Sequence, residues 1–192
     1  MGQLVRAQTV AVKAGEMPFQ YLTFALGGEM FAVGILNVKE IIEYGHLTEI
    51  PMMPVFICGV INLRGAVVPV IDLSARFGGK PTIAGKRTCI VIVEVTDDDT
   101  RHDIGIMVDA VSEVLEIPAS EIEPPPTFGA RIRADFIFGM GKVAGKFVIL
   151  LNIDKILSIE EIALLTGSGS GDEEVLALSE IIGEKADLIT TR

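Results

Sequence analysis

Apolar and polar residues alternate in several short runs that are bounded by glycine or proline, a pattern typical of half-buried β-strands. The clearest run, residues 21–35 (YLTFALGGEMFAVGI), alternates on both sides of Gly27 and Gly28, and this spacer predicts a tight β-hairpin. A second run, residues 59–73 (GVINLRGAVVPVIDL), predicts another hairpin that turns at Gly65. The pattern therefore predicts a strand-rich protein.

Further strands are expected in the second half of the chain. Residues 88–95 (TCIVIVEV) are rich in β-branched side chains and predict a strand that ends in a polar turn at residues 97–103. Residues 104–117 (IGIMVDAVSEVLEI) predict one strand that pairs back across this turn. The prolines at residues 124–126 predict a connection outside any central ladder.

Two segments between the predicted hairpins have a less regular pattern. Residues 36–45 (LNVKEIIEYG) fit a short helix or a corner from strand to helix. Residues 54–59 (PVFICG) fit a single helical turn after two chain-breaking prolines.

The chain contains an internal repeat. GVINLRGAVVPVIDL aligns with GMGKVAGKFVILLNI at residues 139–153, and VKEIIE at residues 38–43 resembles VSEVLE at residues 111–116. A repeated unit of about 70 to 80 residues, rich in short strands and glycine turns, predicts two small β-barrels packed together. The repeat leaves open which strands belong to which barrel, because exchanged strands would leave the same pattern.

The end of the chain differs in composition from the rest. Residues 166–171 (TGSGSG) are typical of a flexible linker. Residues 172–182 (DEEVLALSEII) begin with acidic side chains and place Val175, Leu178 and Ile182 on one helical face, which predicts an amphipathic helix. Two interpretations stay open: a natural tail helix, or a linker that joins a foreign peptide.

Composition narrows the classes of function. The net charge of −10 opposes binding to phosphate backbones, and no basic run with interleaved aromatic residues suggests a nucleic-acid partner. No apolar stretch approaches the ~18 residues of a membrane span, and the N-terminus lacks a secretory signal pattern. With only Cys58 and Cys89, we expect a cytoplasmic protein that does not insert into the membrane.

The sequence offers no strong candidate for catalysis or for a cofactor. No close spacing of Cys or His predicts a metal site. Cys58 aligns with Phe138 of the second copy, which indicates an apolar position, so a thiol enzyme using Cys58 is only a remote alternative. GMGKVAGKF resembles a phosphate loop, but its glycine spacing and Phe147 do not fit that motif. We expect a protein without enzymatic activity, cofactor or metal.

Arg64 is the most informative single residue. It precedes the turn glycine of the predicted hairpin, and the second copy has Ala144 at the aligned position, so the fold does not require a guanidinium there. A charged side chain at this corner is either a recognition residue or an ordinary surface cation in an ion pair worth ~0 to 1 kcal/mol. The residues alone leave both interpretations open.

Several of these segments together resemble the CheW-type chemotaxis coupling proteins. The resemblance is carried by VKEIIE, by FICGVINLRGAVVPVIDLSARFG at residues 56–78, and by DAVSEVLEI and FIFGMGKVAGKFVILLNIDKIL in the second copy. It covers residues 19–165 and implies two SH3-like, five-stranded β-barrels. An N-terminal arm at residues 1–18 and the linker with its tail helix at residues 166–192 lie outside it.

The resemblance implies a non-catalytic adaptor that couples methyl-accepting chemoreceptor tips to the regulatory domain of a CheA-type histidine kinase, at the inner face of the membrane. A CheW-like adaptor of a non-motility chemosensory pathway is the alternative. Cys58 departs from the Lys or Arg that the family commonly has there. The candidate residues for binding the receptor and the kinase are Val38, Glu40, Cys58, Gly59, Asn62 and Arg64. Glu40 and Arg64 are conjectured to form a pair.

Overall fold

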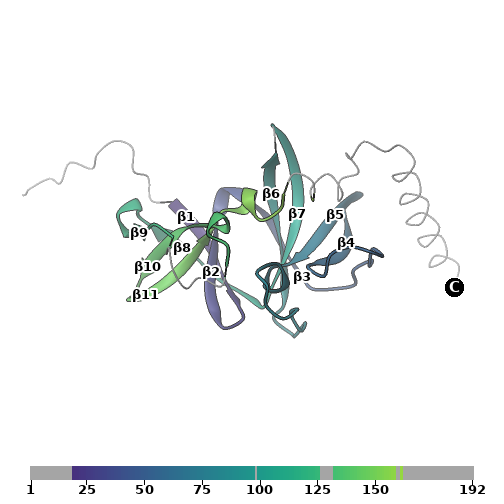
Figure 1. Ribbon diagram of the computed structural model, residues 1–192, viewed down its shortest axis with the longest axis horizontal. Helices are drawn as coiled ribbons and strands as arrows, with labels where there is room; N and C mark the ends of the chain where they lie inside the picture. The colour runs from purple at the N-terminus through teal and green to yellow at the C-terminus, as the bar shows by residue number, and fades with distance from the viewer. Residues whose placement is uncertain (1–18, 98, 126–131, 159–160, 162–192) are drawn as a thin grey trace, which may run out of the picture.

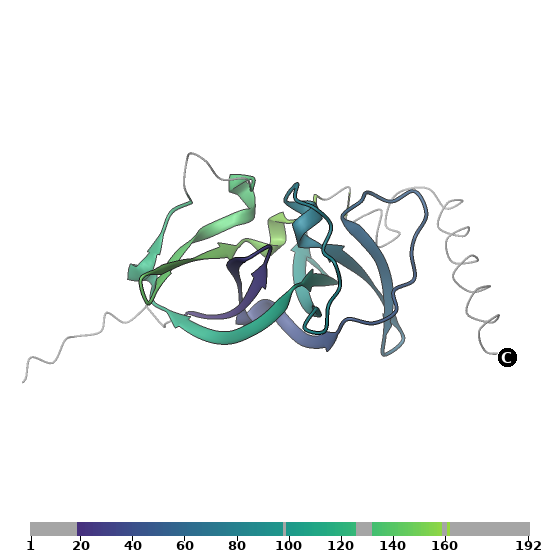
Figure 2. The ribbon, with the colours of Figure 1, turned by 90° about the horizontal axis from the view of Figure 1, so that it is seen from below.

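The computed structural model describes residues 19–97, 99–125, 132–158 and 161. These residues form two β-sheets that lie side by side as two lobes (Figures 1 and 2). One sheet has the strand order β8 (Ala110–Ile117), β1 (Phe19–Leu26), β2 (Glu29–Gly34), β11 (Lys146–Leu151), β10 (Ile137–Val143) and β9 (Ile122–Glu123). The other has the order β3 (Val38–Glu43), β6 (Cys89–Asp97), β7 (Thr100–Val108), β5 (Ala66–Asp72) and β4 (Ile57–Leu63).

The helical segments that the structure describes are short connections. They are α1 (Leu73–Arg76) and the 3-10 turns η1 (Ile35–Asn37), η2 (Ala119–Glu121), η3 (Ala134–Phe136) and η4 (Ile153–Lys155). This architecture confirms the predicted mainly β fold with two sheets. One sheet has a sixth strand, the two-residue β9, beyond the five strands that were expected.

The sheet topology answers the question of strand exchange. The first hairpin, β1 and β2, pairs with strands from the second half of the chain and not with the strands that directly follow it. Strand β2 runs parallel to β11, and in the other sheet β5 runs parallel to β7. Each lobe therefore uses the same arrangement, a long hairpin joined in parallel to a second hairpin, although the two lobes are interleaved in sequence (Figure 1).

Hydrogen bonds reproduce the sequence repeat in three dimensions. The Asp72 amide donates to the Phe56 carbonyl at 2.8 Å, and at the aligned positions the Asn152 amide donates to the Phe136 carbonyl at 2.8 Å. The same local contact thus ends β5 in one lobe and β11 in the other. Duplication of sequence has produced duplication of backbone geometry.

The predicted single strand at residues 104–117 is wrong. Strand β7 begins at Thr100, so the polar turn is shorter than expected, and β8 leaves for the other sheet after Asp109. The Asp109 amide donates to the Ala25 carbonyl at 3.1 Å, and its carboxylate accepts from the Gly27 amide at 2.8 Å. These bonds hold the crossover against β1, and no local pattern signals it.

Two helical expectations also fail. Residues 36–45 form the 3-10 turn η1 and then strand β3, whose side chains alternate between half-buried and exposed. In residues 54–59, the Ile57 amide donates to the Pro54 carbonyl at 2.9 Å and β4 starts at once. Pairing of β3 with β6 and of β4 with β5 outweighs the weak helical preference of these short segments.

The two lobes share one core. Its largest cluster combines Phe24 and Phe31 of one sheet with Ile71, Val91 and Ile106 of the other. Phe31 stacks on Phe77 at 5.8 Å between ring centroids, and Phe77 lies 5.9 Å from Phe136, so aromatic contacts run across the junction. Burying each such side chain contributes about 1.5–3 kcal/mol. This shared core fixes the lobes as one unit.

The remaining expectations about organisation are tested only in part. None of the helices in the described part of the chain has the length and apolar character that a membrane crossing requires. The predicted arm at residues 1–18, the linker and the tail helix at 172–182 lie outside the described residues. The division of the chain at residues 19 and 165 stays a prediction.

Candidate functional site

Arg64 lies at the tip of the hairpin formed by β4 and β5. Arg64 and Gly65 are the two turn residues, and both have positive φ, 53° and 91°. The Asn62 side-chain oxygen accepts from the Gly65 amide at 2.8 Å, which supports the turn. The Arg64 side chain is 80% exposed, so the turn presents the guanidinium to solvent.

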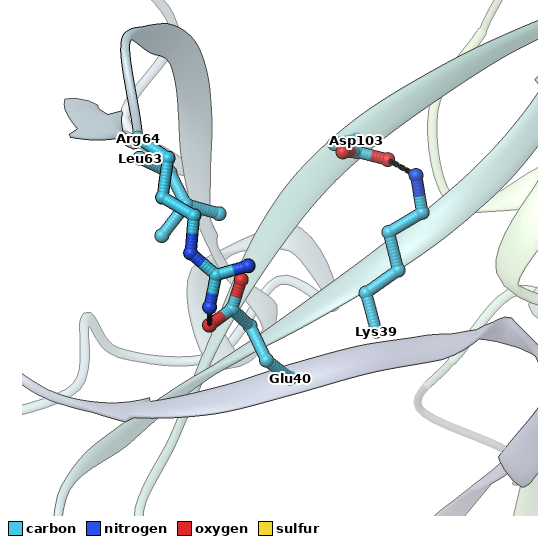
Figure 3. Close-up of a pocket in the computed structure, with 5 residues that line it drawn as sticks. All are labelled: Lys39, Glu40, Leu63, Arg64 and Asp103. Carbon is cyan, nitrogen blue, oxygen red and sulfur yellow. Dashed lines mark hydrogen bonds and ion pairs between the residues drawn. The ribbon is translucent and has the colours of Figure 1, made fainter.

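Glu40 of β3 is the partner of Arg64. The guanidinium NH2 of Arg64 donates to Oε2 of Glu40 at 3.0 Å, so the conjectured pair is present (Figure 3). The pairing of β3 with β6 shifts register between Val38 and Glu40, so a local irregularity of the ladder lies directly before Glu40. The Glu40 side chain is only 26% exposed, and its carboxylate anchors one side of the guanidinium.

A second ion-pair group borders this pair. Lys39 Nζ lies 2.9 Å from Glu94 Oε2 and 2.6 Å from Asp103 Oδ1, and Arg101 lies 3.2 Å from Oε1 of Glu94. Hydrogen bonds to Asp103 and Glu94 raise the pKa of Lys39, and the bond from Lys39 lowers the pKa of Glu94. Together the two groups enclose a shallow pocket of about 330 Å³, here named the Arg64 patch, lined by Lys39, Glu40, Leu63, Arg64 and Asp103 (Figure 3).

Gly59 and Val38 take structural positions. Gly59 is buried with φ 141°, and a Cβ there would lie 2.3 Å from the Thr48 carbonyl oxygen. Thr48 and Val60 exchange two backbone hydrogen bonds of 2.9 Å, so the small size of Gly59 lets this segment approach β4. Val38 is half-buried and packs against the shared core.

Cys58 lies apart from the Arg64 patch. Six residue steps along β4 separate Cys58 from Arg64, a span of about 20 Å at ~3.3 Å per residue. The half-buried thiol packs against apolar residues, and burial, with a further contribution from the charge of Asp72, raises its pKa to about 11. A thiol that stays protonated at neutral pH is a poor nucleophile, so the alternative of a thiol enzyme is not supported.

The positions aligned with Cys58 and Arg64 differ in environment. Phe138, in the place of Cys58, is 57% exposed, so the apolar character inferred for this position does not come from burial in both lobes. Ala144, in the place of Arg64, has φ 48° and is followed by Gly145 in the same turn geometry. The backbone of the two hairpins is conserved while their surfaces diverge.

Sequence reasoning missed an apolar groove beside the connection between the lobes. It has a volume of about 800 Å³ and is bordered by three exposed apolar side chains, Phe19 (55%), Leu36 (94%) and Phe138 (57%). Residues of β1, η1, β10 and η4 line it, so it forms only when segments far apart in the sequence meet. The one sequence signal was an aromatic residue at position 138, where the first copy has Cys58.

The described part of the chain has no group of three or more His, Cys, Asp or Glu side chains arranged to hold a metal ion. Several charged side chains of this part form ion pairs at the surface, as in the Arg64 patch. The arrangement offers directed hydrogen-bond donors next to apolar surface, which suits recognition of another protein.

Comparisons with known proteins agree with this interpretation. Residues 20–161 match the family model described as CheW-like domain. The Chemotaxis protein CheW of Klebsiella aerogenes is 38% identical over 158 residues, covering 82% of this chain and 93% of that protein. The protein of the same name from Rhizobium meliloti is 33% identical, covering 74% and 89%. The crystal structure of the scaffolding protein TtCheW from Thermoanaerobacter tengcongensis superposes with a TM-score of 0.67 at 36% identity, covering 76% of this chain and 91% of that one.

Proposed function

The chain belongs to the CheW-like family, and we propose that it couples the cytoplasmic tips of chemoreceptors to the regulatory domain of a CheA-type histidine kinase. In this role it is a scaffold without catalytic activity or cofactor. Its proposed location is the cytoplasm, at the inner face of the membrane, where receptor tips assemble into arrays. Binding surfaces and not reacting groups then carry the function.

The Arg64 patch is the observation that carries this proposal. A guanidinium that is 80% exposed occupies a turn position with positive φ, where an arginine is an unusual choice. Its repeat counterpart is Ala144, so the hairpin does not need it. Glu40 holds one side of the guanidinium and leaves further N–H donors free for a partner, a geometry suited to carboxylates or carbonyls of a receptor.

The apolar groove supplies the second part of a receptor surface. Strand β3 begins directly after Asn37, which lines the groove, and reaches Glu40 three residues later. A receptor's helical hairpin can place an apolar ridge against Leu36 and Phe138 while polar side chains meet Glu40 and Arg64. Helix-in-groove binding of this kind combines apolar anchors with a polar rim.

The kinase is proposed to dock barrel to barrel on a different face. A hollow of about 670 Å³ opens between the β1–β2 hairpin and the β10–β11 hairpin. Met30 (38% exposed) and Phe147 (50% exposed) border it, which gives an apolar contact for a second SH3-like barrel. Each contact can be weak, because an array that links many complexes raises the effective concentration of every partner.

The receptor half of the proposal is tested by calorimetric titration with a soluble receptor tip fragment. We expect Arg64→Ala and Leu36→Asp each to weaken binding by about tenfold or more, since each removes a central contact. Lys142→Ala is the matched control, because it removes the Lys142–Glu123 ion pair (2.9 Å) on the repeat-related hairpin. Unchanged affinity in both site variants, with unchanged melting curves, would contradict the receptor assignment.

The kinase half is tested by titration with the kinase regulatory domain. Phe147→Asp is expected to weaken this binding by about tenfold or more, while Arg64→Ala leaves it unchanged. The titration is repeated with a chain that ends at Leu165, where we expect saturable binding to persist. No binding by either chain would contradict the kinase assignment and favour a different pathway.

A further inference from the structure

The connection between α1 and β6 is a positive surface on an acidic protein. The sequence has no Asp or Glu between Asp72 and Glu94, and this stretch contains Lys80, Lys86 and Arg87. All three side chains are exposed, and within the described ranges none of them forms an ion pair. We name residues 80–87 the basic loop.

An apolar side chain lies at the centre of the basic loop. Ile83 is 93% exposed, between Lys80 on one side and Lys86 and Arg87 on the other. An exposed β-branched residue flanked by cations suits a partner that combines acidic and apolar side chains.

Side-chain hydrogen bonds hold the basic loop in one conformation. The carboxylate of Asp72, only 2% exposed, accepts from the amide of Thr82 at 2.6 Å and from its hydroxyl at 2.9 Å. The Ser74 hydroxyl donates to the Lys80 carbonyl at 2.7 Å. A preformed loop loses little conformational entropy when a partner docks, which favours its use as a binding surface.

The last described residues bind α1, the helix that directly precedes this loop. Arg76 at the end of α1 donates through Nε to the Ile156 carbonyl at 2.7 Å and binds Glu161 through two bonds of 2.8 Å. Its guanidinium also lies 4.4 Å from the ring centroid of Phe56. Figure 2 places the yellow-green end of the described chain at the junction of the two lobes, and Lys80 follows Arg76 by only four residues.

We propose that residues 172–182 of this chain dock on its own basic loop. The segment DEEVLALSEII carries four acidic residues and no basic one, which matches the charge of Lys80, Lys86 and Arg87. Its predicted apolar face, Val175, Leu178 and Ile182, provides a cover for Ile83. The Gly-Ser segment at residues 166–171 supplies a flexible tether between the two.

Chain length favours an intramolecular contact. The chain from Glu161 to Asp172 can extend by up to ~3.5 Å per residue. This reach exceeds the distance that the four residue steps from Arg76 to Lys80 can span. A short flexible tether produces an effective concentration in the millimolar range, so even a weak contact is occupied. Charge attraction makes the docking sensitive to salt.

The test compares backbone amide NMR spectra of the full chain and of a chain ending at Leu165. We expect truncation to shift the amides of the basic loop, and high salt to produce the same change in the full chain. Reversing the loop charges (Lys80→Glu, Lys86→Glu, Arg87→Glu) is expected to abolish the effect of truncation. Reversing the tail charges as well (Asp172→Lys, Glu173→Lys, Glu174→Lys) is expected to restore it.

Charge reversals on the other lobe, at Lys142 of β10 and Lys146 of β11, are the control and are expected to leave the effect of truncation intact. Loop amides that do not respond to truncation would overturn the proposal. Shifts that grow with protein concentration would also overturn it, because they would assign the contact to a second copy of the chain.

Discussion

Arg64 and Ala144 occupy the same left-handed corner of two hairpins that the internal repeat relates. Their φ angles are 53° and 48°, and each is followed by a glycine with positive φ. A side chain with a Cβ costs roughly 1–2 kcal/mol in this region. Arg64 combines that cost with a solvent-exposed guanidinium that binds Glu40, whereas Ala144 has only a methyl group. The pair separates what the turn requires from what the proposed recognition requires.

Ala144→Gly is therefore expected to stabilise the protein. Glycine relieves the left-handed strain, and its greater freedom in the unfolded chain offsets part of the gain, which leaves about 0.5–1 kcal/mol. Urea unfolding should show a higher midpoint with an unchanged slope. Receptor binding serves as the control and should not change. A lower midpoint would mean that the Ala144 methyl makes a contact worth more than the strain.

Gly59→Ala is expected to destabilise the protein by about 2 kcal/mol or more. The new methyl would meet the Thr48 carbonyl oxygen at 2.3 Å, and the backbone has φ 141°, which L-residues rarely adopt. Gly27→Ala is the control, since Gly27 has φ 58° with open space around it and should cost only about 1–2 kcal/mol. Equal losses in the two variants, measured by urea unfolding, would refute a special role for the contact with Thr48.

Alkylation of Cys58 at neutral pH is expected to be slow. Burial and the charge of Asp72 raise the pKa of this thiol to about 11, so the thiolate fraction is small. In a Cys89→Ala background, we expect iodoacetamide to react about tenfold or more slowly than with free cysteine, whose pKa is ~8.5. The rate should rise with pH beyond the range in which free cysteine has levelled off. Rapid reaction at neutral pH would reverse the conclusion that Cys58 is inert.

The ion pair between Lys39 and Glu94 is expected to make the free energy of unfolding decrease in acid. The hydrogen bond from Lys39 lowers the pKa of Glu94 in the folded state below the ordinary value of 4.5, so the unfolded chain binds a proton more readily. The contribution of this pair is thus present above pH 4.5 and lost as pH falls through the lowered pKa.

Urea midpoints at about pH 3 and about pH 5 provide the measurement for this pair. Glu94→Gln should reduce the difference between the two midpoints, because the titrating carboxyl is gone. Glu29→Gln is the control, since Glu29 is an exposed strand residue outside the ion pairs found in the described chain. An identical acid loss in Glu94→Gln and in the unsubstituted protein would argue against this linkage.

Much of the fold could be predicted from local sequence patterns. The hairpins at Gly27 and at Gly65 followed from alternation around a glycine turn, and both are present. The corner position of Arg64 followed from the same reasoning. In contrast, the segment of β3 was expected to be a short helix or a corner from strand to helix, and the start of β4 a helical turn. Such short strands offer little signal until their neighbours pair with them.

Only part of the candidate site could be predicted from the sequence. Comparison of the two copies singled out Arg64, since Ala144 showed that the fold does not need the charge. The resemblance grouped Cys58, Gly59 and Arg64, yet β4 places the first two far from the third and gives Gly59 a packing role. The apolar groove escaped prediction because its residues come from β1, η1, β10 and η4.

The sequence by itself determined the strand-rich class, the duplication, the turn at Arg64 and Gly65, and the family. These features depend on residues within one turn or one alternating run, where spacing alone sets the geometry. The tertiary structure alone decided that β1 and β2 join strands from the second half of the chain, that Glu40 meets Arg64, and that Arg76, just before the basic loop, binds Glu161. Each of these contacts joins residues far apart in sequence, and only burial of a shared core selects among the many pairings that local patterns allow.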